Sequence, residues 1–352
     1  CSGLGESGAL SRIHSLDYLK LARAVLVAFG HTYWLQSHAN TLTFLLGNGL
    51  MRVMVPAFCI VAGFFLYSAA ARGKGAKWLW RATALYIFWM AIYLPFWLNE
   101  VHDLVSLVKT LLLGFFHLWF MAGIIVAGVM ILGLRWLSRV IGLGTEVPLL
   151  VAVVAVCAVA GVAMQYANLS GLAQIGVRKF ENGIFMCFPF VAIGYLLRRR
   201  LVLGGPLALP GRSAVLVALA VGTVLLLGEA WLVQARWGVS VMLDIPLTAY
   251  LAAPALFLAV LETQMPEPPI RLDPISGAIY FMHVLVLKLA AVLGVSSLGA
   301  LMLLAVGLPA LAALGLGALR VPGFVTGAPQ QAGTGSDTVP LAVRQPRTGA
   351  DA

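Results

Sequence analysis

The chain has 352 residues, of which 61% are hydrophobic and only 10% are charged, and its mean hydropathy is +0.97. Soluble domains carry about 25% charged residues, so this composition excludes a soluble globular protein and indicates an integral membrane protein. The formal net charge of +10 is better explained by Lys and Arg in cytoplasmic loops than by nucleic acid binding. A nucleic acid partner is therefore not expected. The four cysteines have no metal-binding spacing, so no metal site is expected either.

Apolar segments long enough to cross a bilayer, which takes about 20 residues, recur along the whole chain. The ten segments are 18–36, 48–71, 79–98, 118–134, 147–165, 183–197, 213–233, 244–262, 276–293 and 299–319. Residues 99–117 are too polar at their start to span, so we expect an amphipathic or re-entrant piece near one surface. The sequence thus predicts an all-α polytopic membrane domain over residues 1–320 with about ten transmembrane helices. Residues 321–352 are rich in Gly, Pro, Ala and polar residues, which predicts a disordered cytoplasmic tail.

The Lys and Arg residues of the connecting loops indicate the orientation, because cytoplasmic loops carry an excess of both. With ten spans and a cytoplasmic N-terminus, twelve of these residues fall inside and four outside, which favours an N-in, C-in topology. The inner set is Arg72, Lys74, Lys77, Arg81, Arg135, Arg139, Arg198, Arg199, Arg200, Arg212, Arg271 and Arg320, and the outer set is Lys109, Arg178, Lys179 and Arg236.

The first predicted span contains ionisable residues that are costly in a bilayer. Lys20 and His31 are eleven residues apart, so on a helix they lie roughly 20° apart in azimuth and about 16 Å apart along the axis. Asp17 falls on nearly the same stripe and can pair with Lys20. Arg23 lies about 80° off the stripe, where head-group binding and a structural ion pair are equally open. Lys20 can reach the inner interface, whereas His31 lies deeper, where it either makes one packing hydrogen bond or takes part in function.

The stretch "LDYLKLARAVLVAFGH" resembles the first-helix signature of the membrane acyltransferase family 3, in which an Asp, a basic residue and a His occupy the positions of Asp17, Lys20 and His31. Further segments resemble the family in the same order along the chain. They are "VPAFCIVAGFFLYSA", "AKWLWRATALYIFW", "HLWFM", "ENGIFMCFPFVAIGYLLRRR" and "AIYFMHVLVL". Ala62 replaces the usual Ser, and Trp78 stands where the family has a first Arg before Arg81, with Lys77 adjacent.

The resemblance implies an enzyme of the bacterial inner membrane that takes an acyl group, usually acetyl, from cytoplasmic coenzyme A. The acceptor is a hydroxyl of an extracytoplasmic or lipid-linked glycan, such as an exopolysaccharide. Cations near the inner interface would hold the phosphates of acetyl-CoA, and the candidates are Lys20, Arg23, Lys77 and Arg81. His31 would then act as general base or, alternatively, carry the acyl group as an acyl-histidine.

Other polar residues near the predicted outer side are candidates for acceptor binding. His117 and Trp119 begin the fourth span, although an interfacial Trp is commonly a membrane-belt residue. Glu181 and Asn182 precede the sixth span, where Asn182 can instead cap a helix. Glu229 is the carboxylate within an apolar run, so it either faces an acceptor cavity or forms a buried ion pair.

A different class of protein, a transporter or flippase for an anionic or sugar substrate, would also place charges inside the membrane. The cations Lys20, Arg23 and Arg81 gather toward one side of the membrane. This one-sided arrangement suits a cytoplasmic anion better than alternating access, so the acyltransferase is the favoured interpretation.

Overall fold

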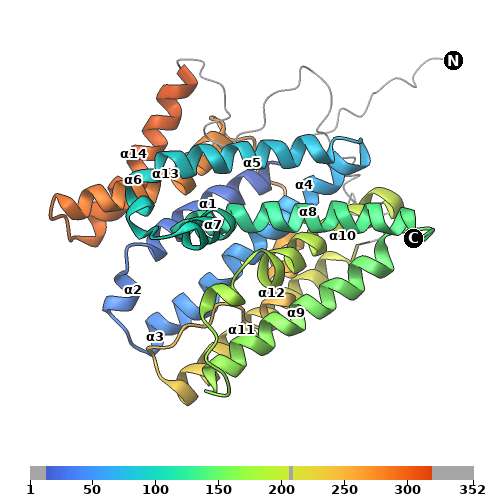
Figure 1. The fold of residues 1–352 in the computed structure, drawn as a ribbon, viewed down its shortest axis with the longest axis horizontal. Helices are drawn as coiled ribbons and strands as arrows, with labels where there is room; N and C mark the ends of the chain where they lie inside the picture. Colours follow the sequence, from blue (N-terminus) through green and yellow to red (C-terminus); the bar gives the residue numbers. More distant parts are fainter. Residues whose placement is uncertain (1–12, 206–208, 319–352) are drawn as a thin grey trace, which may run out of the picture.

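The computed structural model describes residues 13–205 and 209–318, and within these ranges the chain forms helices and their connections without a strand (Figure 1). The α-helices are α1 (His14–Gly30), α2 (Trp34–Ser37), α3 (Thr41–Phe44), α4 (Met54–Ala71), α5 (Gly75–Ile92), α6 (Leu94–Trp97), α7 (Leu104–Leu113), α8 (Trp119–Val140), α9 (Val147–Leu169), α10 (Phe188–Gly204), α11 (Arg212–Trp237), α12 (Ala249–Glu262), α13 (Leu272–Val292) and α14 (Leu298–Ala318). The predicted tail, residues 321–352, and Arg320 lie outside the described residues.

Helices occupy all ten predicted apolar segments, and in the described ranges six continuous helical stretches are long and apolar enough to cross a membrane. They are Thr41–Ala71, Phe116–Val140, Val147–Leu169, Arg212–Trp237, Leu272–Val292 and Leu298–Ala318. Helices α5 and α6 together make a seventh candidate that is bent by 64°. The all-helical membrane fold is therefore confirmed, while the count of ten spans and the N-in, C-in orientation stay predictions.

Several predicted helix ends differ from the structure by a few residues, and two of them lie in the first two spans. The first helix was expected to continue to residue 36, but α1 ends at Gly30 and His31 is its C-cap. The Thr32 hydroxyl donates to the Phe29 carbonyl, and Tyr33 takes a left-handed conformation with φ of 58°, so the backbone leaves the helix there. The second helix, expected from residue 48, becomes α-helical only at Met54, after a π-helical turn and a 3-10 turn.

The predicted amphipathic piece at residues 99–117 contains the exposed helix α7, none of whose residues is buried. Its N-terminus is a capping box, in which the Asp103 carboxylate accepts from the Ser106 N–H at 2.6 Å. These hydrogen bonds from Ser106 hold the pKa of Asp103 below its usual value. The segment thus contains a short exposed helix, and its amphipathic or re-entrant placement near a membrane surface stays a prediction.

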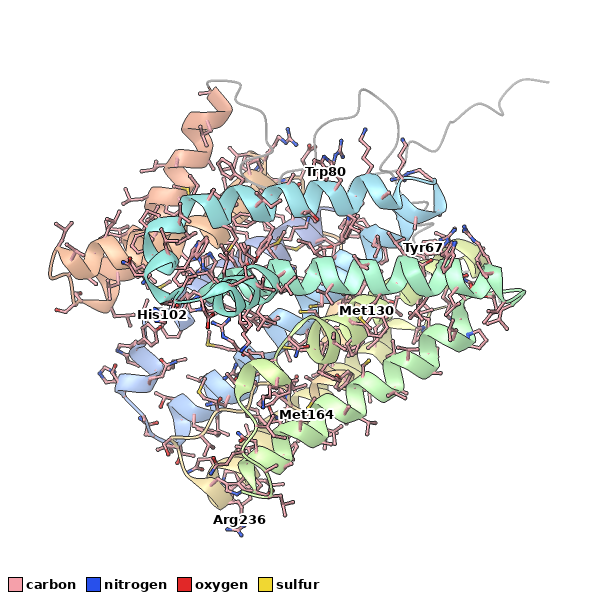
Figure 2. The ribbon with its side chains drawn as sticks, viewed as in Figure 1. Tyr67, Trp80, His102, Met130, Met164 and Arg236 are labelled. Carbon is pink, nitrogen blue, oxygen red and sulfur yellow. The ribbon has the colours of Figure 1, made fainter. Side chains whose placement is uncertain are left out.

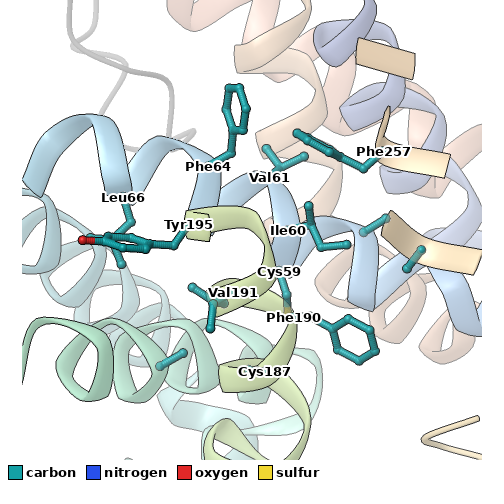
Figure 3. Close-up of a cluster of buried hydrophobic side chains, with 14 of the residues drawn as sticks. Cys59, Ile60, Val61, Phe64, Leu66, Cys187, Phe190, Val191, Tyr195 and Phe257 are labelled. Atoms are coloured by element: carbon teal, nitrogen blue, oxygen red, sulfur yellow. The ribbon is translucent and has the colours of Figure 1, made fainter. Parts of the chain in front are cut away.

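Helices α4 and α10 form the centre of the largest apolar core (Figure 3). Their backbones touch at two glycines: a Cβ on Gly63 would lie 1.8 Å from the Val191 carbonyl oxygen, and one on Gly194 would lie 1.9 Å from that of Ile60. Small residues allow such close helix contact inside membranes, where packing replaces the hydrophobic effect as the driving force. This helix pair is the scaffold of the molecule.

The ends of the helices separate the two predicted sides of the molecule. Tyr67, near the end of α4, and Arg236, at the end of α11, lie on opposite sides of the helical body in Figure 2. Tyr67 precedes a loop predicted to be cytoplasmic, and Arg236 belongs to the predicted outer set. The two residues therefore lie at opposite ends of the body, as expected if the loop after Tyr67 is cytoplasmic and Arg236 is on the outer side.

Candidate active site

His31 lies where α1 ends, and its partner comes from α13. The His31 Nδ1 atom is 2.8 Å from Nε2 of His283, and Nδ1 of His283 is 2.8 Å from the Ile279 carbonyl oxygen. The two imidazole rings stack with centroids 5.0 Å apart. His283 is fully buried, so this pair closes one side of the site.

The hydrogen bonds define the tautomers of the two neutral rings. Because a carbonyl oxygen only accepts, Nδ1 of His283 carries the proton and its Nε2 is an acceptor. Nδ1 of His31 must then donate to His283, which leaves Nε2 of His31 with a free lone pair. This nitrogen is the basic atom of the site.

Lys20 and His31 contact the same neighbour, helix α13. The Lys20 ammonium is 2.8 Å from Asp273 and 3.4 Å from Asp17, and His31 contacts His283 farther along α13. The common stripe and the Asp17–Lys20 pair predicted for α1 are both present. The contacts advance in the same direction along both helices, so α1 and α13 are parallel.

Tyr93 holds the turn of α13 that carries His283. Its hydroxyl donates to the Phe281 carbonyl at 2.8 Å and accepts from the Leu285 N–H at 3.0 Å. These two backbone groups are normally partners in an α-helix, so the hydroxyl stands between them. Tyr93 is fully buried, and it anchors the backbone on either side of His283.

A strained backbone surrounds His31. Tyr33 and Phe116 are the two non-glycine residues with positive φ in the described ranges, and both line the same cavity as His31. The Phe116 ring is 5.1 Å from the His31 ring. Such conformations cost about 1–3 kcal/mol each and gather at functional sites, which supports assigning the site here.

A cavity of about 890 Å³ opens beside His31. The predicted site residues that line it are His31, His117, Trp119, Glu181 and Asn182, contributed by three separate stretches of chain. The volume is of the size that holds a small ligand. The structure therefore brings the predicted base and four of the five predicted acceptor residues to one place.

His117 is buried next to the histidine pair. Its ring centroid lies 5.1 Å from that of His283 and 6.4 Å from that of His31. Neither ring nitrogen has a hydrogen-bond partner among the residues described. Burying an unsatisfied polar group costs about 1–3 kcal/mol, so a ligand in the cavity is the natural partner for this ring.

The four cations predicted to hold phosphates have different surroundings. The Lys20 ammonium is paired with two carboxylates, those of Asp17 and Asp273. Arg23 is completely buried, with its guanidinium 3.4 Å from the centroid of the Phe58 ring, and both Nη atoms lack partners in the described part of the chain. Lys77 and Arg81 are exposed on α5. Among the four, Arg23 lies nearest the site, because Phe58 also lines the cavity.

Glu229, predicted as an acceptor residue, does not line the cavity. Its carboxylate accepts from the N–H groups of Leu247 and Thr248, from the Thr248 hydroxyl and from the Tyr166 hydroxyl. It therefore anchors the connection that leads into α12. Sequence alone could not reveal this, because the partners are backbone groups that are distant in the chain.

Asn182 has the capping role that the sequence offered as the alternative to acceptor binding. Its side chain accepts from the N–H groups of Ile184 and Phe185 and so caps the π-helical turn Gly183–Cys187. It also lies at the cavity wall. Because the carbonyl oxygen is already engaged twice, helix capping is its established role in this structure.

Sequence reasoning missed Arg52 and Asp244, which line the cavity as an ion pair at 3.2 Å. It also did not include His283 among the candidate site residues. Arg52 was visible as the single cation within the segment "NGLMRVMVPAF", and a charge in a predicted span is a signal of function. Asp244 had no such signal, because it lies at the edge of a predicted span.

No group of three or more His, Cys, Asp or Glu side chains is arranged to hold a metal ion in residues 13–205 and 209–318. The cysteines of these ranges, Cys59, Cys157 and Cys187, are free and buried.

Comparison with known proteins identifies the family of the chain. A family model described as "Acyltransferase domain" matches residues 13–319, so the chain belongs to acyltransferase family 3. Its apolar helices are those of a membrane protein of this family.

An amino-acid racemase of Enterococcus faecalis is 25% identical over 136 residues, covering 34% of this chain and 19% of the racemase. The chain thus matches about a fifth of that relative's length. No solved structure matches significantly.

Proposed function

We propose that the protein transfers an acyl group, most simply acetyl, from cytoplasmic acyl-CoA to a hydroxyl of an extracytoplasmic or lipid-linked glycan, with His31 as general base. The observation that carries the proposal is the free Nε2 of His31 at a cavity wall, with its tautomer set by His283 and Ile279. A base must lie within hydrogen-bond reach of the proton that it removes, and the cavity gives an acceptor hydroxyl that access.

In the proposed reaction, Nε2 of His31 takes the proton of the acceptor hydroxyl as its oxygen attacks the thioester carbonyl. The new C–O bond forms, the C–S bond breaks, and the proton passes from His31 to the leaving thiolate. His283 accepts from Nδ1 throughout and stabilises the imidazolium that forms on His31. His117, with no partner among the described residues, would donate to the carbonyl oxygen as negative charge develops there.

The residues present fit an acyl-CoA donor in part. Arg23 offers two buried guanidinium nitrogens without partners among the described residues, beside Phe58, which lines the cavity. A charged group buried without hydrogen bonds is costly, and an anionic or carbonyl group of the donor would satisfy it. Lys77 and Arg81 are exposed on α5 and available to phosphates from outside the cavity, whereas the charge of Lys20 is already neutralised by its aspartates.

The test is transfer of label from acetyl-CoA to membrane glycan by His31→Ala protein. A general base contributes about 10²–10⁴-fold, so turnover should fall at least about a hundredfold in protein that is still folded and inserted. His38→Ala is the matched control, because His38 is exposed and its ring bonds to the nearby Ser37 and Trp34. Wild-type turnover by His31→Ala would remove His31 from the mechanism.

Direct transfer and an acyl-histidine differ in what acid quenching traps. Label that stays on the wild-type protein and is lost in His31→Ala would establish the acyl-enzyme route. Label found only in donor and glycan during turnover supports the general-base route.

A further inference from the structure

A polar corner of the His31 cavity has no part in the chemistry described so far. Arg52 Nη1 lies 3.2 Å from the Asp244 carboxylate, and Arg52 Nη2 lies 3.1 Å from the Asn48 side-chain oxygen. All three residues line the cavity that contains His31. The guanidinium and the carboxylate thus present hydrogen-bond donors and acceptors side by side at the wall.

The backbone that carries Asp244 is held in place by side chains from other helices. Asn48 accepts from the Leu243 N–H, and the Gln165 side-chain oxygen accepts from the N–H groups of Asp244 and Ile245. Gln165 also donates to the Ile245 carbonyl and is almost completely buried. Buried polar networks with all members satisfied specify a rigid arrangement. Asn48 and Gln165 therefore fix the backbone around Asp244, and the Asp244 carboxylate is available to Arg52 and to the cavity.

Glu181 faces the same corner. It lines the main cavity and a neighbouring one of about 450 Å³, and Asp244 is also common to both linings. The Glu181 carboxyl makes no hydrogen bond or ion pair with the described residues. It lies in the connection between α9 and α10, where burial first, and the Asp244 carboxylate second, raise its pKa to about 8. Near neutral pH it is thus mainly protonated and can donate a hydrogen bond.

The central charges of this corner, Arg52 and Asp244, cancel as an ion pair. Arg178 also lines the cavity, where it donates to the Gly114 carbonyl, and its charge acts on Glu181. A ligand that reaches the Arg52–Asp244 pair therefore meets one donor and one acceptor whose charges balance. The cavity wall also carries the aromatic rings of Trp119 and Phe116. Pockets that combine an apolar or aromatic wall with a few fixed polar groups orient their ligands through those groups.

We propose that Arg52 and Asp244, together with Glu181, form the acceptor subsite and select an uncharged sugar ring through a pair of adjacent hydroxyl groups. One hydroxyl donates to the Asp244 carboxylate, and its neighbour accepts from the Arg52 guanidinium. The aromatic wall covers the apolar face of the ring. This proposal rests on the proposed function, since it names the class of acceptor that His31 deprotonates.

The subsite predicts a preference by charge that two variants, each removing one charge of the pair, should reverse. Asp244→Asn leaves the Arg52 guanidinium unpaired, so an anionic sugar should become the preferred ligand. Arg52→Gln leaves the Asp244 carboxylate unpaired, so a cationic sugar should become preferred. Each reversal is a gain of binding for one probe, which a misfolded protein cannot produce.

The experiment measures binding to the full chain in lipid nanodiscs by intrinsic tryptophan fluorescence, without donor. The probes are methyl glucoside and methyl galactoside, each with its uronate and its 2-amino-2-deoxy analogue. Wild type should bind at least one neutral glycoside about fivefold more tightly than its charged analogues, and the two variants should reverse that order. Gln36→Ala, which changes another polar residue of the wall, should leave the order unchanged.

The same titration in His31→Ala protein separates this proposal from the proposed function, because binding needs no base. Loss of acyl transfer with the sugar preference intact would affect only the role of His31. The acceptor subsite is overturned if no neutral glycoside binds saturably, if wild type prefers a charged analogue, or if the variants change all probes equally.

Discussion

Two regions of the molecule are built in opposite ways. The α4–α10 scaffold is apolar, and its regular helices touch backbone to backbone at Gly63 and Gly194. The region around His31 is polar, and α1 stops there while a left-handed Phe116 enters α8 through a 3-10 turn. Regular helices satisfy their own backbone groups, so they can pack closely but offer few free polar atoms. The site uses helix ends and broken segments, and it depends on the scaffold for its rigidity.

The difference can be tested by variants that affect one region only. Scaffold variants should lower the amount of folded protein while the molecules that do fold keep their turnover. Site variants should lower turnover or change ligand choice in protein whose unfolding temperature equals that of wild type. A variant that moved both quantities together would argue against the separation.

The largest effect is expected for Gly63→Ala. The added methyl group would meet the Val191 carbonyl oxygen at 1.8 Å, and a backbone atom cannot move aside as a flexible side chain can. Overpacking of this kind should cost about 3 kcal/mol of stability, measured as a lower unfolding midpoint in detergent. The matched control is Gly133→Ala on α8, where nothing lies within 4 Å of the new methyl group. An equal loss in both variants would show that the close helix contact is not the cause.

A smaller loss of stability is expected for Glu229→Ala. The change removes the acceptor for the Leu247 and Thr248 N–H groups and for the Tyr166 hydroxyl, so unfolding should become easier by about 2 kcal/mol. The acceptor KM per folded molecule should not change, because Glu229 does not line the cavity. A raised acceptor KM at unchanged stability would restore the role in acceptor binding that its position in the sequence suggested.

The next effect falls on turnover. His283→Ala removes the acceptor of the His31 Nδ1 hydrogen bond, so His31 loses its fixed tautomer. We expect kcat to fall about tenfold, a part of what a general base contributes, with KM unchanged. His283→Asn can supply a side-chain oxygen to His31 and should recover most of the rate. If the His283→Asn variant were as slow as the alanine variant, His283 would be a packing residue only.

The smallest effect is a pH dependence of stability from Glu181. Its pKa is raised to about 8 in the folded protein from an ordinary value of 4.5, with Asp244, Arg52 and Arg178 as its charged neighbours. Its stabilising contribution is therefore complete below about pH 4.5 and is lost as the pH rises through 8. Glu181→Gln does not ionise, so its unfolding midpoint relative to that of wild type should rise between about pH 4.5 and pH 8 and stay constant above that. A difference that is independent of pH would contradict the raised pKa.

Much of the fold could be predicted from the sequence, because hydropathy reports directly which segments prefer lipid. All ten apolar segments contain helices, and the exposed helix at residues 104–113 was expected as amphipathic. The ends of the helices were less predictable. Whether α1 stops at Gly30 depends on the turn at Tyr33 and on contacts with distant segments, which hydropathy does not report.

For the site, the sequence by itself determined the family and indicated the ionisable residues of the first helix as candidates. An Asp, a Lys and a His on one stripe of an apolar helix are costly enough in lipid that their presence alone indicates a role. Only the tertiary structure decided what these residues contact. It brought His283 and Asp273 to α1, paired Arg52 with Asp244, and assigned Glu229 to the backbone, because each of these partners is remote in the chain and is selected by packing.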